Sequence, residues 1–410
     1  MKDLLPLLKT RIPGPKSRAL ARQLRHYESR NVTYVSDHWP IFWQRAAGAN
    51  VWDVDGNRYV DLTAAFGVAN VGHSNPRVVA AIQAQAGKLL HAMGDVHPNE
   101  LKLKLARELA ALTFGRWNKS EARVVFANSG AEAVEVALKT AAIHTERPGV
   151  IAFEGAYHGL TYGALDTTWR ADFRSPFSKQ LGHFTAHVPF GRLPEVANIR
   201  DFGAVIVEPI QGRGGIVVPP DDFLPKLRRF CDDHDLLLIL DEIYTGFCRT
   251  GRWFACEHSG VLPDLVCVGK AMAGGFPISA CIGSEKVMDS WPESQGEAIH
   301  TSTFMGNPVG CVAALASIGE MKRLKLDTRS RKLGEWLATR LARIGKVRGK
   351  GLMLGLEVSN AVPLVEKLLQ RGVLALPEGS RAEVVGFTPP LVISKRQLGY
   401  CLEALSLAFP

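Results

Sequence analysis

The chain contains 410 residues, of which 46% are hydrophobic and 22% are charged, a composition that is typical of folded globular proteins and excludes global disorder. This length favours two packed units over one small core. The formal net charge of +9 comes without a recognisable nucleic-acid-binding module, so we expect anionic metabolites and no nucleic acid as partners. No apolar run reaches the roughly 20 residues of a membrane-spanning helix, and we expect no membrane partner.

The cysteines are scattered, odd in number and without the close pairing of zinc or redox motifs. This distribution indicates reduced thiols in a cytoplasmic protein and predicts no metal site. Residues 2–30 are rich in Lys and Arg and loosely resemble an organelle transit peptide. They also contain Pro6, Pro13 and Pro15 and few serines, so we expect an arm that docks on the fold.

Residues 51–60 alternate in polarity around Asp55-Gly56, the pattern of a short β-hairpin, and predict a small N-terminal subdomain. Residues 101–112 have helical spacing. Short apolar runs follow at residues 124–126, 150–153, 204–207, 236–240 and 265–268. Because helix-sized segments separate these runs, they predict parallel strands that are buried on both faces of a sheet.

A parallel sheet binds its ligands at the carboxyl ends of its strands. Glu208, Asp241 and the pair Gly269-Lys270 directly follow three of the apolar runs, so we expect the chemistry of the protein there. From about residue 321 the pattern changes to a helix rich in Arg and Lys, a Gly-rich turn and a last helical segment. This change predicts a C-terminal domain.

The segment Asn128-Ser129-Gly130-Ala131-Glu132 lies between a predicted strand and a helix with apolar periodicity. Ser129 and Glu132 have the spacing of a capping box, so backbone N–H groups at this helix start can face a phosphate. By itself the pattern fits an ordinary N-cap without a ligand better, because most helices begin in this way.

Asp241 and Lys270 both follow fully apolar strands, which a solvated surface charge would not need. Pyridoxal phosphate requires an amine for its Schiff base and a carboxylate that keeps its ring nitrogen protonated. The small residues around Lys270 leave room for such a cofactor. Tyr157 in Tyr157-His158-Gly159 follows another strand, where an aromatic ring can stack on a planar cofactor, although simple packing is the commoner role of a tyrosine there.

Motifs at residues 51–61, 126–133, 153–159, 208–215, 241–251, 269–277 and 300–308 occur in the order of a known family. From about Ile12 to its end, the chain resembles the class III, or omega-type, pyridoxal-phosphate-dependent aminotransferases, such as the ornithine, acetylornithine and 4-aminobutyrate aminotransferases. The resemblance implies the α/β fold type I of pyridoxal-phosphate-dependent transferases, with a mostly parallel central sheet flanked by helices. Residues 76–320 would form the large cofactor-binding domain, residues 1–75 an N-terminal arm and small subdomain, and residues 321–410 a C-terminal small domain. The N- and C-terminal segments would together build the smaller α+β domain.

The resemblance also implies roles for individual residues. Lys270 would hold the cofactor as an internal aldimine, and Asp241 would pair with the pyridine nitrogen. The other residues that match cofactor-binding positions are Ser129, Gly130 and Ala131 at the phosphate, Tyr157 and Ile243 on the two ring faces, and His158, Glu208 and Tyr244. Ser302 and Thr303 match a pair that family members lend to the phosphate of a partner subunit, so the resemblance implies a homodimer with active sites at the subunit interface.

Two positions depart from the family pattern. Tyr244 replaces a common glutamine that contacts the phenolic oxygen of the cofactor; its hydroxyl either replaces the glutamine or points elsewhere. Gly386 stands where many members have an arginine that binds a substrate carboxylate, and glycine has no side chain to replace it. This substitution removes the expected basis for binding 2-oxoglutarate and leaves Glu208 without the partner that it often has in relatives.

The implied reaction moves an amino group from an omega-amino acid, a diamine or an amino acid to a keto acid. Two alternatives remain open at this stage. A racemase or epimerase of the same family would use the same motifs and need no keto acid. A binding or scaffolding protein that retains the fold without catalysis is opposed by the presence of Lys270, Asp241 and the phosphate-binding segment.

Overall fold

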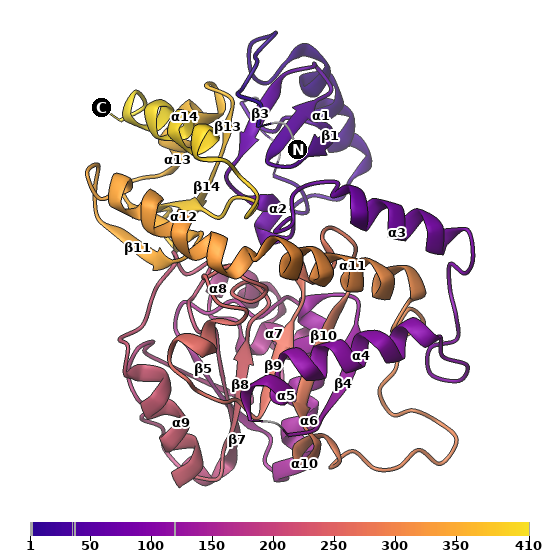
Figure 1. The fold of residues 1–410 in the computed structure, drawn as a ribbon. Coiled ribbons are helices and arrows are strands. Elements are labelled where there is room, and N and C mark those ends of the chain that lie inside the picture. Colours follow the sequence, from indigo (N-terminus) through magenta and orange to yellow (C-terminus); the bar gives the residue numbers. More distant parts are fainter. Residues whose placement is uncertain (1–2, 35, 37, 119, 410) are drawn as a thin grey trace.

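The computed structural model describes residues 3–34, 36, 38–118 and 120–409. Its largest sheet has seven strands in the order β4-β10-β9-β8-β7-β5-β6 (Figure 1). β10 is antiparallel to both of its neighbours, whereas the pairs from β9 to β6 are parallel. The strands are β4 (Ala122–Ala127), β5 (Gly149–Phe153), β6 (Thr185–Val188), β7 (Phe202–Val207), β8 (Leu237–Asp241), β9 (Leu265–Val268) and β10 (Ser279–Ser284).

All five apolar runs that predicted strands lie in this sheet, so the predicted mostly parallel α/β architecture is confirmed. Sequence reasoning did not find β6 or β10. β6 is only partly buried at three of its four residues, and β10 has the sequence Ser-Ala-Cys-Ile-Gly-Ser, whose small residues lack the apolar signature of a central strand.

Both faces of the large sheet are buried, as the continuous apolar runs predict. In β7, Ala204 and Ile206 pack in one apolar cluster with α6 (Gly130–Thr145), whereas Val205 and Val207 belong to the cluster that contains α9 (Phe223–Asp233). Successive side chains of a strand point to opposite faces. Helices therefore cover both sides, and polar groups gather at the ends of the strands.

The helices of the large unit also include α4 (Glu100–Leu112), which confirms the helix predicted at residues 101–112. α11 (Pro308–Leu324) packs on α4 and on α3 (Pro76–Ala86). The short helices are α2 (Ala64–Gly67), α5 (Phe114–Trp117), α7 (Tyr162–Thr167), α8 (Ala171–Arg174), α10 (Glu285–Met288), η1 (Ser175–Gln180), η2 (Ile199–Asp201), η3 (Ala255–His258) and η4 (Lys270–Ala273). No helix among the described residues is long and apolar enough to cross a membrane.

Two smaller sheets lie together above the large sheet in the view of Figure 1. One has the order β1-β2-β3-β13 and joins β1 (Trp43–Ala47), β2 (Asn50–Asp53) and β3 (Arg58–Asp61) to β13 (Val373–Leu374). β2 and β3 are the predicted hairpin, with Val51 opposite Tyr59. The chain's first and last segments therefore share a sheet, since β13 pairs with β3.

The other small sheet has the order β11-β12-β15-β14 and consists of β11 (Val347–Lys350), β12 (Met353–Glu357), β14 (Leu376–Glu378) and β15 (Val384–Phe387). The glycines of the predicted turn are Gly349 in β11, Gly351 between the two strands and Gly355 in β12. α12 (Leu326–Leu341), α13 (Val362–Leu369) and α14 (Lys395–Ser406) complete this part. The predicted division after residue 320 falls inside α11, and the division of the chain into three parts stays a prediction.

The N-terminal arm docks on the fold as the sequence analysis expects. Its helix α1 (Pro15–Tyr27) begins at the hairpin turn, where the Asp55 carboxylate accepts hydrogen bonds from the backbone N–H groups of Lys16 and Ser17. Leu7 forms a β-bridge with Arg58. These contacts hold the arm against the first small sheet.

Candidate functional site

A cavity of about 500 Å³ opens at the carboxyl ends of the large sheet. Strands β4, β5, β7, β8 and β9 all end at this edge, because they run in one direction. The cavity is lined by Ser129, Gly130, Ala131, Tyr157, His158, Gly159, Leu160, Thr161, Glu208, Asp241, Ile243, Tyr244 and Lys270. It thus brings together every residue that the sequence analysis assigns to the cofactor except Ser302 and Thr303.

The start of α6 forms one end of the cavity. Ser129 is the N-cap, and its hydroxyl accepts a hydrogen bond from Glu132 N at 3.3 Å. The Glu132 carboxylate accepts from Asn128 N at 2.9 Å, one residue before the N-cap, so the second bond of a capping box is displaced by one position. A Cβ on Gly130 would lie 2.9 Å from Ile243 Cδ1. Glycine at this position therefore lets the helix start approach the cavity wall.

The Asp241 carboxylate is fixed by two hydrogen bonds. His158 Nδ1 donates to its Oδ2 at 2.8 Å, and Ile243 N donates to its Oδ1 at 3.0 Å. Asp241 is only 4% exposed. His158 Nε2 is buried without a hydrogen-bond partner among the described residues. Because a carboxylate only accepts hydrogen bonds, this arrangement places the imidazole proton on Nδ1.

Lys270 follows β9 and enters the cavity at the start of η4. Its φ of +40° lies in the left-handed region, which is rare for a residue with a side chain. Burial lowers the pKa of its amine, although the carboxylates of Asp241 and Glu208 act in the opposite direction. A lowered pKa increases the unprotonated fraction, which is the form that attacks a carbonyl.

The Tyr244 ring lies beside this amine, with Lys270 Nζ 4.1 Å from the ring centroid. Two glycines make room for the ring, since a Cβ on Gly67 or on Gly212 would lie 2.4 Å from a ring carbon. The Tyr244 hydroxyl donates to Thr388 Oγ1 at 3.1 Å. The sequence left open whether this hydroxyl faces the cofactor or points elsewhere. In the structure it is bonded to the segment that follows Gly386.

Glu208 is held by backbone partners. Its two carboxylate oxygens accept from Tyr157 N and Gly212 N, each at 3.0 Å. Burial raises the pKa of this carboxyl, and the nearby Asp241 charge raises it further. Gly386 lies on β15, where the space that a longer side chain would enter contains Glu378.

Ser302 and Thr303 do not line the cavity of their own chain. The hydroxyl of Ser302 accepts a hydrogen bond from Asn128 Nδ2 at 3.0 Å, next to the start of α6. Thr303 is exposed. Their predicted role at the phosphate of a partner subunit stays a prediction.

Sequence reasoning did not identify Arg213 or Glu378. The Arg213 guanidinium lies 4.7 Å from the Tyr157 ring centroid, and its backbone oxygen accepts from Gly379 N at 3.2 Å. No local pattern reveals this arrangement, because the two contacting segments are far apart in the sequence. The only signal was the glycine at 386, which indicates that another residue can occupy that space.

Comparison with known proteins identifies the family. The family model described as aminotransferase class-III matches residues 32–409. The chain belongs to the class III aminotransferases. Members of this family depend on pyridoxal phosphate, so the chain is a pyridoxal-phosphate-dependent aminotransferase.

Individual relatives agree with this assignment. The acetylornithine aminotransferase of Methanosarcina mazei is 38% identical over 93% of this chain and 95% of its own length. The putrescine aminotransferase of Pectobacterium atrosepticum is 39% identical over 91% of this chain and 83% of its own length. The ornithine aminotransferase structure from Toxoplasma gondii has a TM-score of 0.85 and 31% identity and covers 95% of this chain and 94% of its own. None of the comparisons supports the racemase alternative.

The cavity fits pyridoxal phosphate. Its volume lies within the range of about 300–1,000 Å³ that is usual for small-molecule sites. A helix N-terminus at Ser129 provides backbone donors for a phosphate, whereas Asp241 provides a buried carboxylate for a ring nitrogen. Lys270 places an amine, the group that covalent attachment requires, in the same cavity. The groups that the cofactor requires therefore line one cavity.

Proposed function

We propose that this aminotransferase moves an amino group from an omega-amino acid, a diamine or an amino acid to a keto acid, with Lys270 as the catalytic residue. One observation carries the assignment of residues: the Lys270 amine and the hydrogen-bonded Asp241 carboxylate line one cavity that ends at an exposed helix start. When bound, the cofactor supplies an electron sink for the substrate carbon.

Each remaining wall of the cavity has a role in this proposal. Ser129, Gly130 and Ala131 bind the phosphate group through hydroxyl and backbone donors. Asp241 would pair with the ring nitrogen, and His158 positions Asp241 through the hydrogen bond to Oδ2. Tyr157 and Ile243 would cover the two faces of the ring, and Glu208 and Tyr244 line the same cavity.

Lys270 has two tasks. Its amine would hold the cofactor covalently and, when free, would accept a proton from the substrate carbon and donate it again to complete the transfer. Burial in the cavity lowers the pKa of the amine, which increases the unprotonated fraction that can act as a base. Its tether beside the reacting atoms gives it a high effective concentration.

Replacement of Lys270 tests this proposal. We expect Lys270→Ala to lower kcat by at least about a thousandfold, because general acid–base catalysis is lost, and to abolish the visible absorbance of the covalently bound cofactor. Lys286→Ala, which removes an exposed lysine of the large unit, serves as the control and keeps both signals. Full activity of Lys270→Ala would contradict the assignment.

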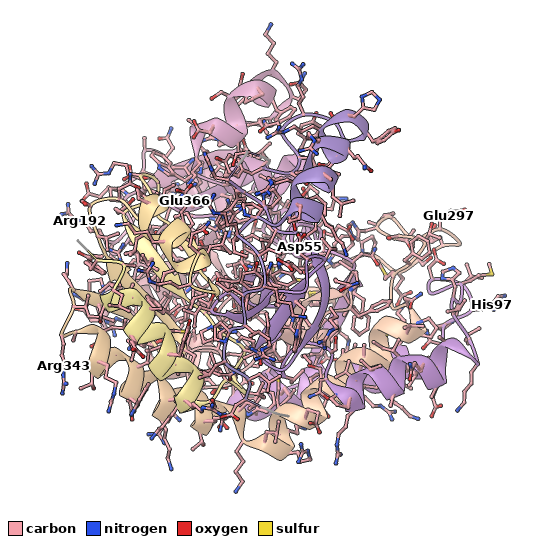
Figure 2. All side chains as sticks on the ribbon, turned by 90° about the horizontal axis from the view of Figure 1, so that it is seen from above. Asp55, His97, Arg192, Glu297, Arg343 and Glu366 are labelled. Atoms are coloured by element: carbon pink, nitrogen blue, oxygen red, sulfur yellow. The ribbon has the colours of Figure 1, made fainter. Side chains whose placement is uncertain are left out.

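We also propose that the protein is a homodimer with its active sites at the subunit interface. Two segments that project on the same side of the molecule, marked by His97 and Glu297 in Figure 2, contact each other through the Thr301 hydroxyl and the Asp95 carboxylate at 2.8 Å. They contain apolar side chains that are more than half exposed: Leu90, Met93, Val96, Ile299 and Phe304. Clustered apolar exposure of this kind supports an interface between subunits.

Complementation between two inactive variants tests whether Thr303 acts in the active site of its own subunit or in that of the partner subunit. Lys270→Ala and Thr303→Glu, which places a negative charge at the proposed phosphate contact, should each be inactive. If Thr303 acts across the interface, mixing the two variants recovers on the order of a quarter of wild-type activity, since each mixed dimer has one intact site. No recovery from subunits that light scattering shows to have exchanged would refute the shared site. Ser294→Glu in the same loop is the control.

The cytoplasm is the proposed location of the enzyme. All seven cysteines are free and buried, which fits a reducing compartment. Cell fractionation tests this, and recovery of the protein from an oxidising compartment would oppose it.

A further inference from the structure

Glu378 places a carboxylate beside Gly386. It is the last residue of β14 and pairs with Val384 of β15, so its side chain lies on the same face of the sheet as position 386. A Cβ on Gly386 would be 3.0 Å from Glu378 Cγ and 3.6 Å from Oε1. The side chain of Glu378 therefore fills the space that glycine leaves open.

This carboxylate is buried next to the cavity. Glu378 is 9% exposed, and its charge acts on both Lys270 and Tyr244, which line the cavity. Among the described residues its side chain forms no hydrogen bond and no ion pair. A mostly buried carboxylate without a hydrogen-bond partner can still accept hydrogen bonds from a ligand.

The cations whose charges act on Glu378 have contacts of their own. The Arg213 guanidinium stacks on Tyr157 at 4.7 Å and on Phe173 at 5.4 Å. Arg170 donates to the backbone oxygens of Arg213 and Gly379 at 3.1 and 2.7 Å. The Lys270 amine belongs to the reaction. The carboxylate thus keeps its hydrogen-bonding capacity for a molecule that enters the cavity.

We propose that Glu378 binds the distal ammonium group of the amino donor, so that the enzyme favours diamines over donors that end in a methyl group or a carboxylate. This inference rests on the aminotransferase function proposed above and specifies its donor. A terminal ammonium provides hydrogen-bond donors and a complementary charge for the unpaired carboxylate. A terminal carboxylate at the same place is repelled by it.

Three five-carbon donors test the inference in the wild-type holoenzyme with pyruvate as acceptor: cadaverine, pentylamine and δ-aminovalerate. We expect kcat/KM for cadaverine to exceed that for pentylamine by roughly tenfold or more, because only the diamine bonds to a charged partner at its far end. Equal values, or a preference for δ-aminovalerate, would overturn the inference and leave the aminotransferase function intact. A wild-type enzyme that converts no amine donor would overturn both.

Two variants assign the preference to Glu378. Glu378→Gln should lower the ratio of kcat/KM for cadaverine over pentylamine by roughly tenfold or more, since a neutral amide loses the charge but keeps the shape. Glu366→Gln removes an exposed carboxylate from the neighbouring helix α13 (Figure 2) and should leave the ratio unchanged. An unchanged ratio in Glu378→Gln refutes the assignment. Should that variant not fold, the wild-type comparison alone decides.

Discussion

Arg249 holds together the parts of the chain that surround the site, and its replacement by methionine gives a sharp stability prediction. The side chain is fully buried. Nη1 donates to the backbone oxygens of Leu352 at 2.8 Å and Pro389 at 2.7 Å, and Nη2 donates to Asn70 Oδ1. One guanidinium therefore connects the N-terminal segment, the Tyr244 loop and the C-terminal small sheet.

The structure sets the size of the effect. Methionine fills much of the volume but donates no hydrogen bond, so three buried oxygens lose a partner, each at a cost of about 1–3 kcal/mol. Burial already lowers the pKa of Arg249 to about 10, which shows that the charge itself is unfavourable there, and its removal offsets part of the loss. We expect Arg249→Met to lower the free energy of unfolding by about 3–5 kcal/mol.

Urea unfolding of the cofactor-free enzyme, followed by circular dichroism, measures this difference. The control is Arg331→Met, whose exposed guanidinium lies 3.7 Å from Glu335; its effect should stay within about 0.5 kcal/mol. If Arg249→Met unfolded at the same urea concentration as the wild type, the three hydrogen bonds would not carry the stability assigned to them.

Two further predictions concern the donor and acceptor sites. Burial raises the pKa of Glu378 to about 7. The charges of Arg213, Lys270 and Arg170 lower this pKa, whereas the charge of Glu208 raises it. The ionised carboxylate therefore forms as pH rises through about 7. The cadaverine-to-pentylamine ratio of kcat/KM should therefore increase between about pH 6 and pH 8, and a flat ratio would contradict the role of the carboxylate. Gly386→Arg combined with Glu378→Ala should improve kcat/KM for 2-oxoglutarate by roughly tenfold or more through a bidentate contact. Gly386→Arg alone should not, because Glu378 occupies the space, and equal gains in both variants would refute that steric argument.

The large sheet was predictable because its strands are buried on both faces. Runs such as residues 204–207 and 265–268 have no polar residue, and short runs of this kind between helix-sized segments are typical of the central strands of a parallel sheet. β10 escaped prediction because small residues at its positions pack against α6 without a strong apolar signal. The small sheets escaped because β13 is two residues long and is defined by its pairing with β3, which only tertiary structure brings together.

In the site, too, residues with a local sequence signal could be predicted, whereas those that depend on tertiary contacts could not. Lys270 and Asp241 could be assigned from sequence because each follows an apolar strand, which fixes its place at one edge of the sheet. Their roles in cofactor binding stay predictions. Tyr244 could not be oriented, since its direction depends on Gly67 and Gly212 on either side and on Thr388 at its hydroxyl. These partners come from three separate parts of the chain.

Cofactor and substrate thus depend on different parts of this molecule. The groups proposed for the cofactor stand at the strand ends of the large sheet, which bring a helix start, a carboxylate and an amine to one cavity. The group proposed for the donor, Glu378, stands on the C-terminal small sheet beside Gly386. A substitution at position 386 or 378 can therefore change which amine enters without disturbing Asp241 or the start of α6. Relatives with the same cofactor chemistry but different named donors, such as acetylornithine and putrescine, are the expected consequence of this separation.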